Sequence, residues 1–370
     1  MPVRIIKEDL TKVQADALVN ATDSRYSGSG GLDLAIHTAS GPQMEAYLAS
    51  LPPLSAGECS VSPAFGLKAD IVIHTVAPVW HGGQAGEEQL LHTCYRSAFE
   101  KAREHGCVSV AVPLLGAGCF GCPEDTVYRI ACTESRYFSD EYDMDISILI
   151  YRGAAQSIAG RERRMLDGLL TRGRAKNRSN LPYAEDTDTE VDFSLVSAPE
   201  EYRECAAMRP APAKMRASAP KTDKAAYAPE EKPGMGFGGS FDDLEQELEK
   251  ELKKKRADGF SETLMAMIDR SGMTDPECYH RANIDRKLFS KIRSDPGYRP
   301  AKKTVLAFAV ALRLDTEETE ILLRSAGYAL NGSKMDTVVL FYISHGCYDI
   351  DRINITLYSY DQEILGARMA

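Results

Sequence analysis

The chain has 370 residues and a formal net charge of −10, with 44% hydrophobic and 26% charged residues. This length predicts two domains, or two domains and a linker, and the composition is that of an ordinary globular protein. No apolar run reaches the roughly 20 residues of a membrane span. The N-terminus lacks the apolar core of a signal peptide, so we expect a cytoplasmic protein. The acidic balance argues against indiscriminate nucleic-acid binding by the whole chain.

The nine cysteines are scattered along the chain. Only Cys119 and Cys122 have the C-x-x-C spacing, and no second pair or histidine pair lies nearby to complete a zinc site. We therefore expect reduced thiols, no metal and no cofactor.

Apolar strands and helical segments alternate over the first 170 residues. Strands are expected at 3–6, 16–20, 57–62, 71–76, 108–115 and 146–151, and helices at 87–105, 123–138 and 157–170. This alternation predicts a mostly parallel sheet with helices on both faces. In such sheets ligands bind beyond the carboxyl ends of the strands.

Two glycine-rich segments each follow a predicted strand. The first is the loop Gly28–Gly31, after which Leu34–Ala39 suits a buried helix, and the second is Gly116–Gly121 (GAGCFG). Facing loops of this kind could hold a diphosphate through backbone N–H groups. Two unrelated structural turns explain the pattern equally well, because neither loop has the spacing of a P-loop or of GxGxxG.

Six short matches, in family order, show that residues 1–171 resemble a macrodomain, the ADP-ribose-binding module. They are Glu8–Thr11 for a GDIT-like turn, Asp16–Asn20 for DAIVN, Ser27–Asp33 for GGGGVD, Ala35–His37 for AIH, Ile73–Pro78 for IHTVGP, and Pro113–Pro123 for the phosphate loop. The resemblance implies a three-layer α/β/α fold, with a mixed and mostly parallel sheet, and a cleft for ADP-ribose or an ADP-ribosylated macromolecule.

The resemblance also implies roles for individual residues. Asp9 is expected to be a buried carboxylate that accepts from the adenine amino group, and Asn20 to help hold the distal ribose. Phe120 is expected on the distal-ribose side, and Tyr151 either stacks on adenine or is an ordinary strand-end aromatic. The full set of implied ligand-binding residues is Asp9, Leu10, Asn20, Gly30, Gly31, Leu32, Gly116, Ala117, Gly118, Cys119, Phe120, Gly121 and Tyr151. His37 and His74 are expected to be structural.

Two carboxylates raise the question of turnover. Hydrolysing relatives have an Asp at the end of the glycine loop, which Asp33 matches, and an Asn where this chain has Asp23. We hypothesise that Asp33, aided by Asp23, orients or activates a water against the bond at the distal ribose. The alternative is binding without turnover.

Regular apolar periodicity is absent from residues 172–239, which are rich in Ala, Pro, Lys and Glu and are predicted to form a disordered linker. Residues 240–258 predict a charged helix, with acids first and lysines last. Its thin leucine stripe fits either a solvated helix or a short dimer contact.

Residues 259–370 predict an all-helical domain. Helices are expected at 260–271, 275–282, 285–294, 302–312 and 316–326, followed by terminal helices over 336–351 and 353–358. Residues 273–330 resemble a divergent Cro/repressor-type domain, which implies a helix-turn-helix-like fold without transferable base contacts.

Basic residues gather in the same region. Residues 280–303 contain eight lysines and arginines against two aspartates, a local balance of +6. This predicts either a basic face for a DNA partner or a solvated face for a protein partner. Two readings of the whole chain therefore stay open: an ADP-ribose-recognising protein with hydrolase activity, and a non-catalytic sensor coupled to a nucleic-acid- or protein-binding module.

Overall fold

The computed structural model describes residues 3–168 and 259–366, and the predicted linker and charged helix at 172–258 lie outside these ranges. The N-terminal domain is built on one six-stranded sheet with the order β1-β6-β5-β2-β4-β3. Its strands are β1 (Arg4–Ile6), β2 (Ala17–Ala21), β3 (Cys59–Pro63), β4 (Ile71–Thr75), β5 (Ser109–Pro113) and β6 (Asp145–Leu149). All pairs are parallel except β3 with β4.

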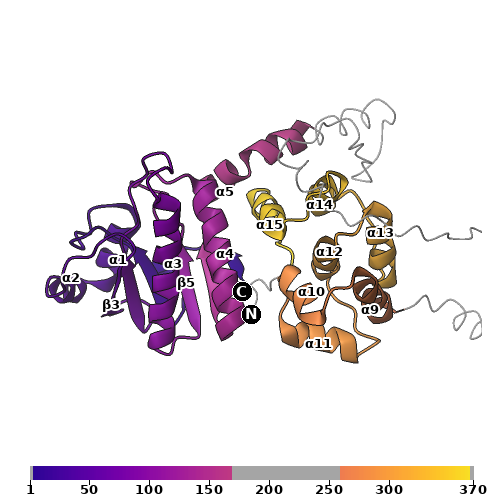
Figure 1. Cartoon of the computed structure of the whole chain (residues 1–370), viewed down its shortest axis with the longest axis horizontal. Helices are drawn as coiled ribbons and strands as arrows, with labels where there is room; N and C mark the ends of the chain where they lie inside the picture. The colour runs from indigo at the N-terminus through magenta and orange to yellow at the C-terminus, as the bar shows by residue number, and fades with distance from the viewer. Residues whose placement is uncertain (1–2, 169–258, 367–370) are drawn as a thin grey trace, which may run out of the picture.

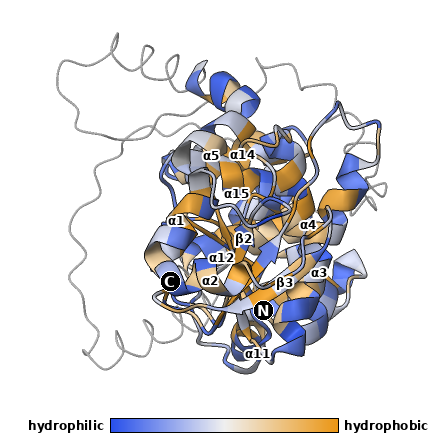
Figure 2. Cartoon of the chain, turned by 90° about the vertical axis from the view of Figure 1, so that its left-hand side faces the viewer, coloured by the Kyte–Doolittle hydropathy of each residue, from blue (hydrophilic) through white to orange (hydrophobic). Residues whose placement is uncertain are grey.

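Helices cover both faces of this sheet, so the predicted three-layer architecture is confirmed (Figure 1). They are the short 3-10 helix η1 (Leu10–Lys12), α1 (Gly31–Ser40), α2 (Pro42–Leu48), α3 (Glu87–Glu104), α4 (Glu124–Tyr142) and α5 (Arg152–Ile158), and residues 160–168 are also helical. The apolar strands form the centre of the domain, and polar residues colour the outer helices (Figure 2). Two apolar clusters, one on each face of the sheet, make the core.

Three local predictions need correction. The helix expected over 157–170 begins earlier, at Arg152, and is broken by a turn at Ala159. Leu34 is 52% exposed, since it lies on the outer side of α1. Helix α2 had no counterpart in the prediction, because its seven residues are too few to show a clear period.

The C-terminal domain is all-helical, as predicted. Its helices are α9 (Phe260–Ser271), α10 (Asp275–Arg281), α11 (Arg286–Ser294), α12 (Lys302–Ala311), α13 (Thr316–Ser325), α14 (Lys334–Ser344) and α15 (Ile350–Ser359). Capping boxes start α10 at Thr274 and α13 at Asp315, which fixes both boundaries by satisfying free backbone N–H groups. No helix among the described residues is long and apolar enough to cross a membrane.

The two domains are packed against each other through α15, which lies beside α4 and α5 (Figure 1). Ile355 is fully buried in the core cluster of the N-terminal domain, whereas Ile353 and Leu357 are buried in the core of the helical domain. An ion pair joins Arg136 of α4 to Asp351. At the sheet edge, Val3 N–H donates to Asn283 Oδ1 and Asn283 Nδ2 donates to the Val3 carbonyl, both at 3.0 Å. Helix α15 is therefore part of both cores.

We expect Ile355→Ala to destabilise the whole chain. The substitution leaves a cavity in the N-terminal core and should lower the free energy of unfolding by about 2–5 kcal/mol. Chemical denaturation followed by circular dichroism measures this loss, and Ile321→Ala, at a 52% exposed position of the helical domain, is the control. Equal small effects of both substitutions would show that α15 does not complete the N-terminal core.

Candidate functional site

The candidate site lies where the sheet changes its winding direction. Strands β2 and β5 are parallel neighbours, but the chain leaves β2 toward the β4 side of the sheet and leaves β5 toward the β6 side. The loops that follow the two strands therefore diverge, and in sheets of this kind ligands bind at such a point, outside the carboxyl ends of the strands. Both glycine-rich loops found in the sequence lie at this edge, at residues 28–31 and 116–121.

The first loop ends at the N-terminus of α1. Helix α1 begins at Gly31 with Gly30 as its N-cap, and no side chain caps it. Among the described residues, the amide N–H groups of Gly30, Gly31 and Leu32 donate to no protein acceptor. Free N–H groups and the positive end of the helix dipole together favour an anion.

The second loop connects β5 to α4. Its amides at Gly118, Cys119 and Phe120 likewise donate to no acceptor within the described parts of the chain. Gly116 has a φ of +80°, and a Cβ there would lie 2.9 Å from the Cys122 sulfur. No other residue fits this turn without displacing that side chain. The loop can therefore turn sharply and leave its amides directed outward.

The buried Asp33 side chain holds the first loop in place through hydrogen bonds. Its Oδ1 accepts from Asn20 Nδ2 at 2.7 Å, and its Oδ2 accepts from Thr22 Oγ1 at 3.0 Å and Gly28 N–H at 3.1 Å. Gly28 packs so closely that an added Cβ would lie 3.0 Å from the His37 ring. Asp33 is buried, and a buried carboxylate with three donors organises its surroundings strongly.

The network continues inward to His74. Because Asn20 Nδ2 also points at His74 Nδ1, 3.2 Å away, this ring nitrogen acts as the acceptor, and Nε2 then donates to Ser62 Oγ at 2.9 Å. Burial and the nearby His37 lower the pKa of His74 to about 3, so the ring is neutral. The expectation of a structural His74 agrees with its complete burial.

Two buried polar atoms next to Asp33 form no hydrogen bond with described residues. They are Asn20 Oδ1 and His37 Nε2, and the latter lies 3.5 Å from Asp33 Oδ1. Sequence reasoning set His37 apart from the site, although its place four residues after Asp33 on one helix puts both on the same face. Unsatisfied buried polar groups are costly, and here they lie directly beneath the glycine loop.

Asp23 has its own hydrogen bonds. Its carboxylate accepts from Arg25 N–H at 2.8 Å and from the amide and hydroxyl of Ser27. Burial raises the pKa of Asp23, but these hydrogen bonds outweigh it, so the pKa lies below its usual value. Asp23 therefore stays ionised and shapes the start of the loop.

Asp9 lies just after β1 and caps η1. Its Oδ1 accepts from Thr11 N–H at 3.1 Å and Thr11 Oγ1 at 2.8 Å, and these bonds lower the pKa of the carboxyl. The expectation of a buried Asp9 is wrong, because its side chain is 42% exposed at the end of an edge strand. Its neighbour Leu10 is the buried residue of the turn and packs in the core.

Tyr151 follows β6, which lies between β1 and β5. It is the N-cap residue of α5 and is 66% exposed, so its ring is free to contact a ligand.

A segment that the sequence analysis left out also reaches the second loop. Trp80 N–H donates to the Phe120 carbonyl at 2.9 Å, and both rings pack against the core cluster. The Glu87 carboxylate accepts from the amides of His81, Gly83 and Ala85, which holds this segment on α3. Three glycines close to Trp80, the only tryptophan of the chain, were the available signal.

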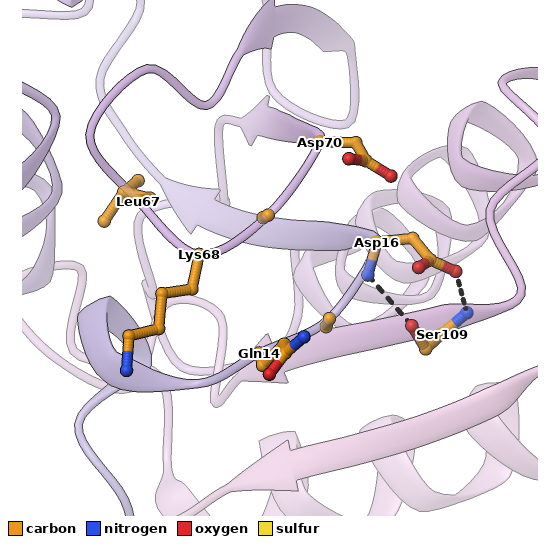
Figure 3. Close-up of a pocket in the computed structure, with 8 residues that line it drawn as sticks. Gln14, Asp16, Leu67, Lys68, Asp70 and Ser109 are labelled. Atoms are coloured by element: carbon orange, nitrogen blue, oxygen red, sulfur yellow. Dashed lines mark hydrogen bonds between the residues drawn. The ribbon is translucent and has the colours of Figure 1, made fainter.

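A depression of about 780 Å³ lies at the other end of the strands, where β2, β4 and β5 begin (Figure 3). It is lined by Gln14, Asp16, Lys68, Asp70 and Ser109. Asp16 accepts from the amides of Val108 and Ser109 at 2.8 and 2.9 Å and thereby ties β2 to β5. These bonds give Asp16 a structural role, and the depression is separate from the glycine-rich loops.

Removal of His74 should change how stability depends on pH. The pKa of His74 is depressed to about 3 in the folded chain, so the unfolded chain binds a proton first as pH falls below about 6.5. Stability is therefore lost between about pH 6.5 and 3, by at most about 1.4 kcal/mol per pH unit for one proton.

The measurement is the free energy of unfolding of the wild type and of His74→Gln between pH 7 and 5. The variant should lose less stability over this range, because glutamine does not titrate. Identical pH dependence of the two proteins would contradict a neutral, buried His74.

Comparison with known proteins finds relatives that share the N-terminal part of this chain. A family model described as "Macro domain" matches residues 19–131. A macro domain-containing protein of Chlorobaculum tepidum is 41% identical over 134 residues, which cover 36% of this chain and 78% of that protein. One of Methanosarcina mazei is 34% identical over 148 residues, covering 40% and 79% of the two chains.

Solved macrodomain structures also match part of this chain. The Oceanobacillus iheyensis macrodomain with ADP is 26% identical with a TM-score of 0.40, and the match covers 44% of this chain and 91% of that one. The Trypanosoma brucei macrodomain in complex with ADP-ribose is 31% identical with a TM-score of 0.39, covering 42% and 67%.

Proposed function

This chain belongs to the macro domain family, and on that premise we propose that its N-terminal domain binds ADP-ribose, free or attached to a macromolecule. One observation carries the proposal: free backbone N–H groups of two loops, at 30–32 and 118–120, lie at the carboxyl ends of the adjacent strands β2 and β5. Such a pair of loops suits a diphosphate, whose two charges need several donors at once.

The order of the strands indicates which side of the loops each end of the ligand occupies. Since β6 and β1 continue the sheet beyond β5, Tyr151 and Asp9 lie on that side of the loops and are proposed to contact the adenine. Asp9 Oδ2 bonds neither Thr11 group and lies 3.6 Å from Lys12 Nζ, and a carboxylate oxygen has two lone pairs, so it can also accept from an exocyclic amine. The distal ribose is then placed on the other side, near the first loop, Asn20 and Phe120.

Hydrolysis at the distal ribose is a second proposal, and the hydrogen bonding modifies it. Asp33 is already the acceptor for three protein donors, and Asp23 is the acceptor for Ser27 and Arg25. Both carboxylates therefore act better as positioning residues than as bases. Asn20 Oδ1 forms no hydrogen bond with described residues, and His37 Nε2 lies 3.5 Å from Asp33 Oδ1. We propose that these two groups meet a water or a ribose hydroxyl when a ligand binds.

Calorimetry of the full chain with ADP-ribose tests binding. We expect Asp9→Ala to weaken ADP-ribose binding at least tenfold, because the amine loses a charged acceptor. The inosine analogue, which lacks that amine, should bind the wild type and the variant alike. Asp269→Ala, an exposed acid in the helical domain, is the control.

Three outcomes would contradict these assignments. No ADP-ribose binding by the wild type, measured also by the fluorescence of Trp80, overturns the proposed function. Unchanged affinity of Asp9→Ala removes Asp9 from the site. Binding without release of ADP-ribose from a modified protein or from an O-acyl ester removes the hydrolysis proposal.

A basic surface on α11 supports a further candidate, binding of nucleic acid by the helical domain. Of the eight basic residues counted in the sequence, Arg293, Lys302 and Lys303 are paired with Asp275, Asp336 and Glu363, so these three charges are compensated by acids outside the counted segment. Arg286, Lys287 and Lys291 are exposed on α11 and make no ion pair with described residues. They are the phosphate contacts that we propose.

A gel shift with duplex DNA at low salt tests this candidate. The variant with Arg286, Lys287 and Lys291 each changed to Gln should lose most of the binding, and the wild type should lose affinity steeply as salt is raised. Arg270→Gln with Arg324→Gln is the matched control, because both arginines are paired with glutamates elsewhere on the domain. Absence of any shift with DNA or RNA favours a protein partner instead.

A further inference from the structure

The end of α15 and the residue pair that follows it make polar contacts with two strand ends of the N-terminal domain. The Tyr358 hydroxyl donates to the Ile150 carbonyl at 2.7 Å, directly after β6. Asp361 accepts from Lys7 Nζ at 2.9 Å, directly after β1. Lys7 is two residues from Asp9, and Ile150 is the residue before Tyr151.

These two strand ends are adjacent. Strands β1 and β6 are parallel and paired, with Ile6 opposite Leu149, and Ile150 N–H donates to the Ile6 carbonyl at 3.2 Å. The helical domain therefore holds, from one side, the two backbone segments that carry Asp9 and Tyr151.

Tyr358 packs against the N-terminal core and lies on α15, a helix whose other face is buried in the helical domain. Asp351, Ile355 and Tyr358 follow at intervals of four and three residues, which places them on one face of α15, and all three contact the N-terminal domain. Ile350, Ile353 and Leu357 form the other face, inside the helical domain. Burial, followed by the nearby Asp361, raises the pKa of Tyr358 to about 12, so its hydroxyl remains a donor at neutral pH.

Neighbouring contacts from the same segment do not reach the strand ends. The Tyr360 hydroxyl donates to the Arg163 carbonyl at 3.1 Å and to Asp167 Oδ1 at 2.7 Å, both in the helix over 160–168. Tyr358 and Tyr360 are thus two half-buried interdomain tyrosines of the same chemistry, and only Tyr358 holds the β6 end.

We propose that Tyr358, assisted by Asp361, is a positioning residue for the adenine end of the cleft, so that the helical domain sets the affinity of the N-terminal domain for adenine nucleotides. This inference rests on the proposed binding of ADP-ribose. Coupling of this kind is reciprocal, since a ligand that binds better when the domains are docked must also stabilise the docking.

Tyr358→Phe removes the hydroxyl alone, and Tyr360→Phe is its matched control. For full-length Tyr358→Phe, calorimetry should show about fivefold weaker binding of both AMP and ADP-ribose, the effect of one lost hydrogen bond, and unchanged binding of ribose 5-phosphate. Tyr360→Phe should bind all three ligands like the wild type. Equal loss for ribose 5-phosphate, or equal loss in both variants, overturns a role specific to the adenine end.

Hydrogen exchange without ligand tests, independently of ADP-ribose binding, whether Tyr358 holds the end of β6. Amides over 150–156 should exchange faster in Tyr358→Phe than in the wild type or in Tyr360→Phe. In the wild type, AMP should slow the exchange of residues 350–361. Unchanged exchange at 150–156 overturns the positioning role of Tyr358. Faster exchange in a protein that binds no adenine nucleotide overturns the proposed function, but it leaves the contact of Tyr358 with the end of β6 supported.

Discussion

Parallel pairing of β2 with β5 is the constraint on which the candidate site depends. The pairing of Ala17 with Val110 and of Leu18 with Ala111 brings both carboxyl ends to the same edge. The chain then leaves the two strands in opposite directions, and ligands of such sheets bind at this point. Asp16 reinforces this pairing at the amino ends through its bonds to two amides of the β5 start. The register of the two strands, and with it the position of both loops, is thus fixed from the amino ends of the strands as well.

Preorganisation of the first loop depends on buried polar groups rather than on packing. A carboxylate buried beneath a loop is unfavourable alone, and Asp33 is stabilised by donors from β2, from Thr22 and from the loop itself. His74 completes this hydrogen-bond network, because as a neutral acceptor it fixes the side-chain amide of Asn20 in one orientation. The loop amides are therefore directed outward before any anion binds, which lowers the entropy cost of binding.

Much of this arrangement could be predicted from sequence, since it depends on local patterns. Alternating apolar strands and helices gave the layers, and glycines after strands gave the loops. The burial and the contacts of individual side chains could not be predicted. Whether Asp9 is buried depends on which strand lies at the edge, and whether Lys302 is free depends on Asp336, 34 residues away. The contact of His37 with Asp33 could be predicted from their spacing of four residues, whereas the absence of a hydrogen bond to its Nε2 could not.

The pattern of α15 contains a sequence signal for the contact between the domains. Helix α15 is apolar on two faces, and a helix that is apolar almost all round is buried on all sides. A terminal helix that only caps a bundle needs one apolar face, so the second face, with Ile355 between Asp351 and Tyr358, requires a partner outside the bundle. The structure supplies α4, α5 and the end of β6. Since α4 begins directly after the second glycine-rich loop and β6 ends at Tyr151, α15 rests on elements that carry the cleft.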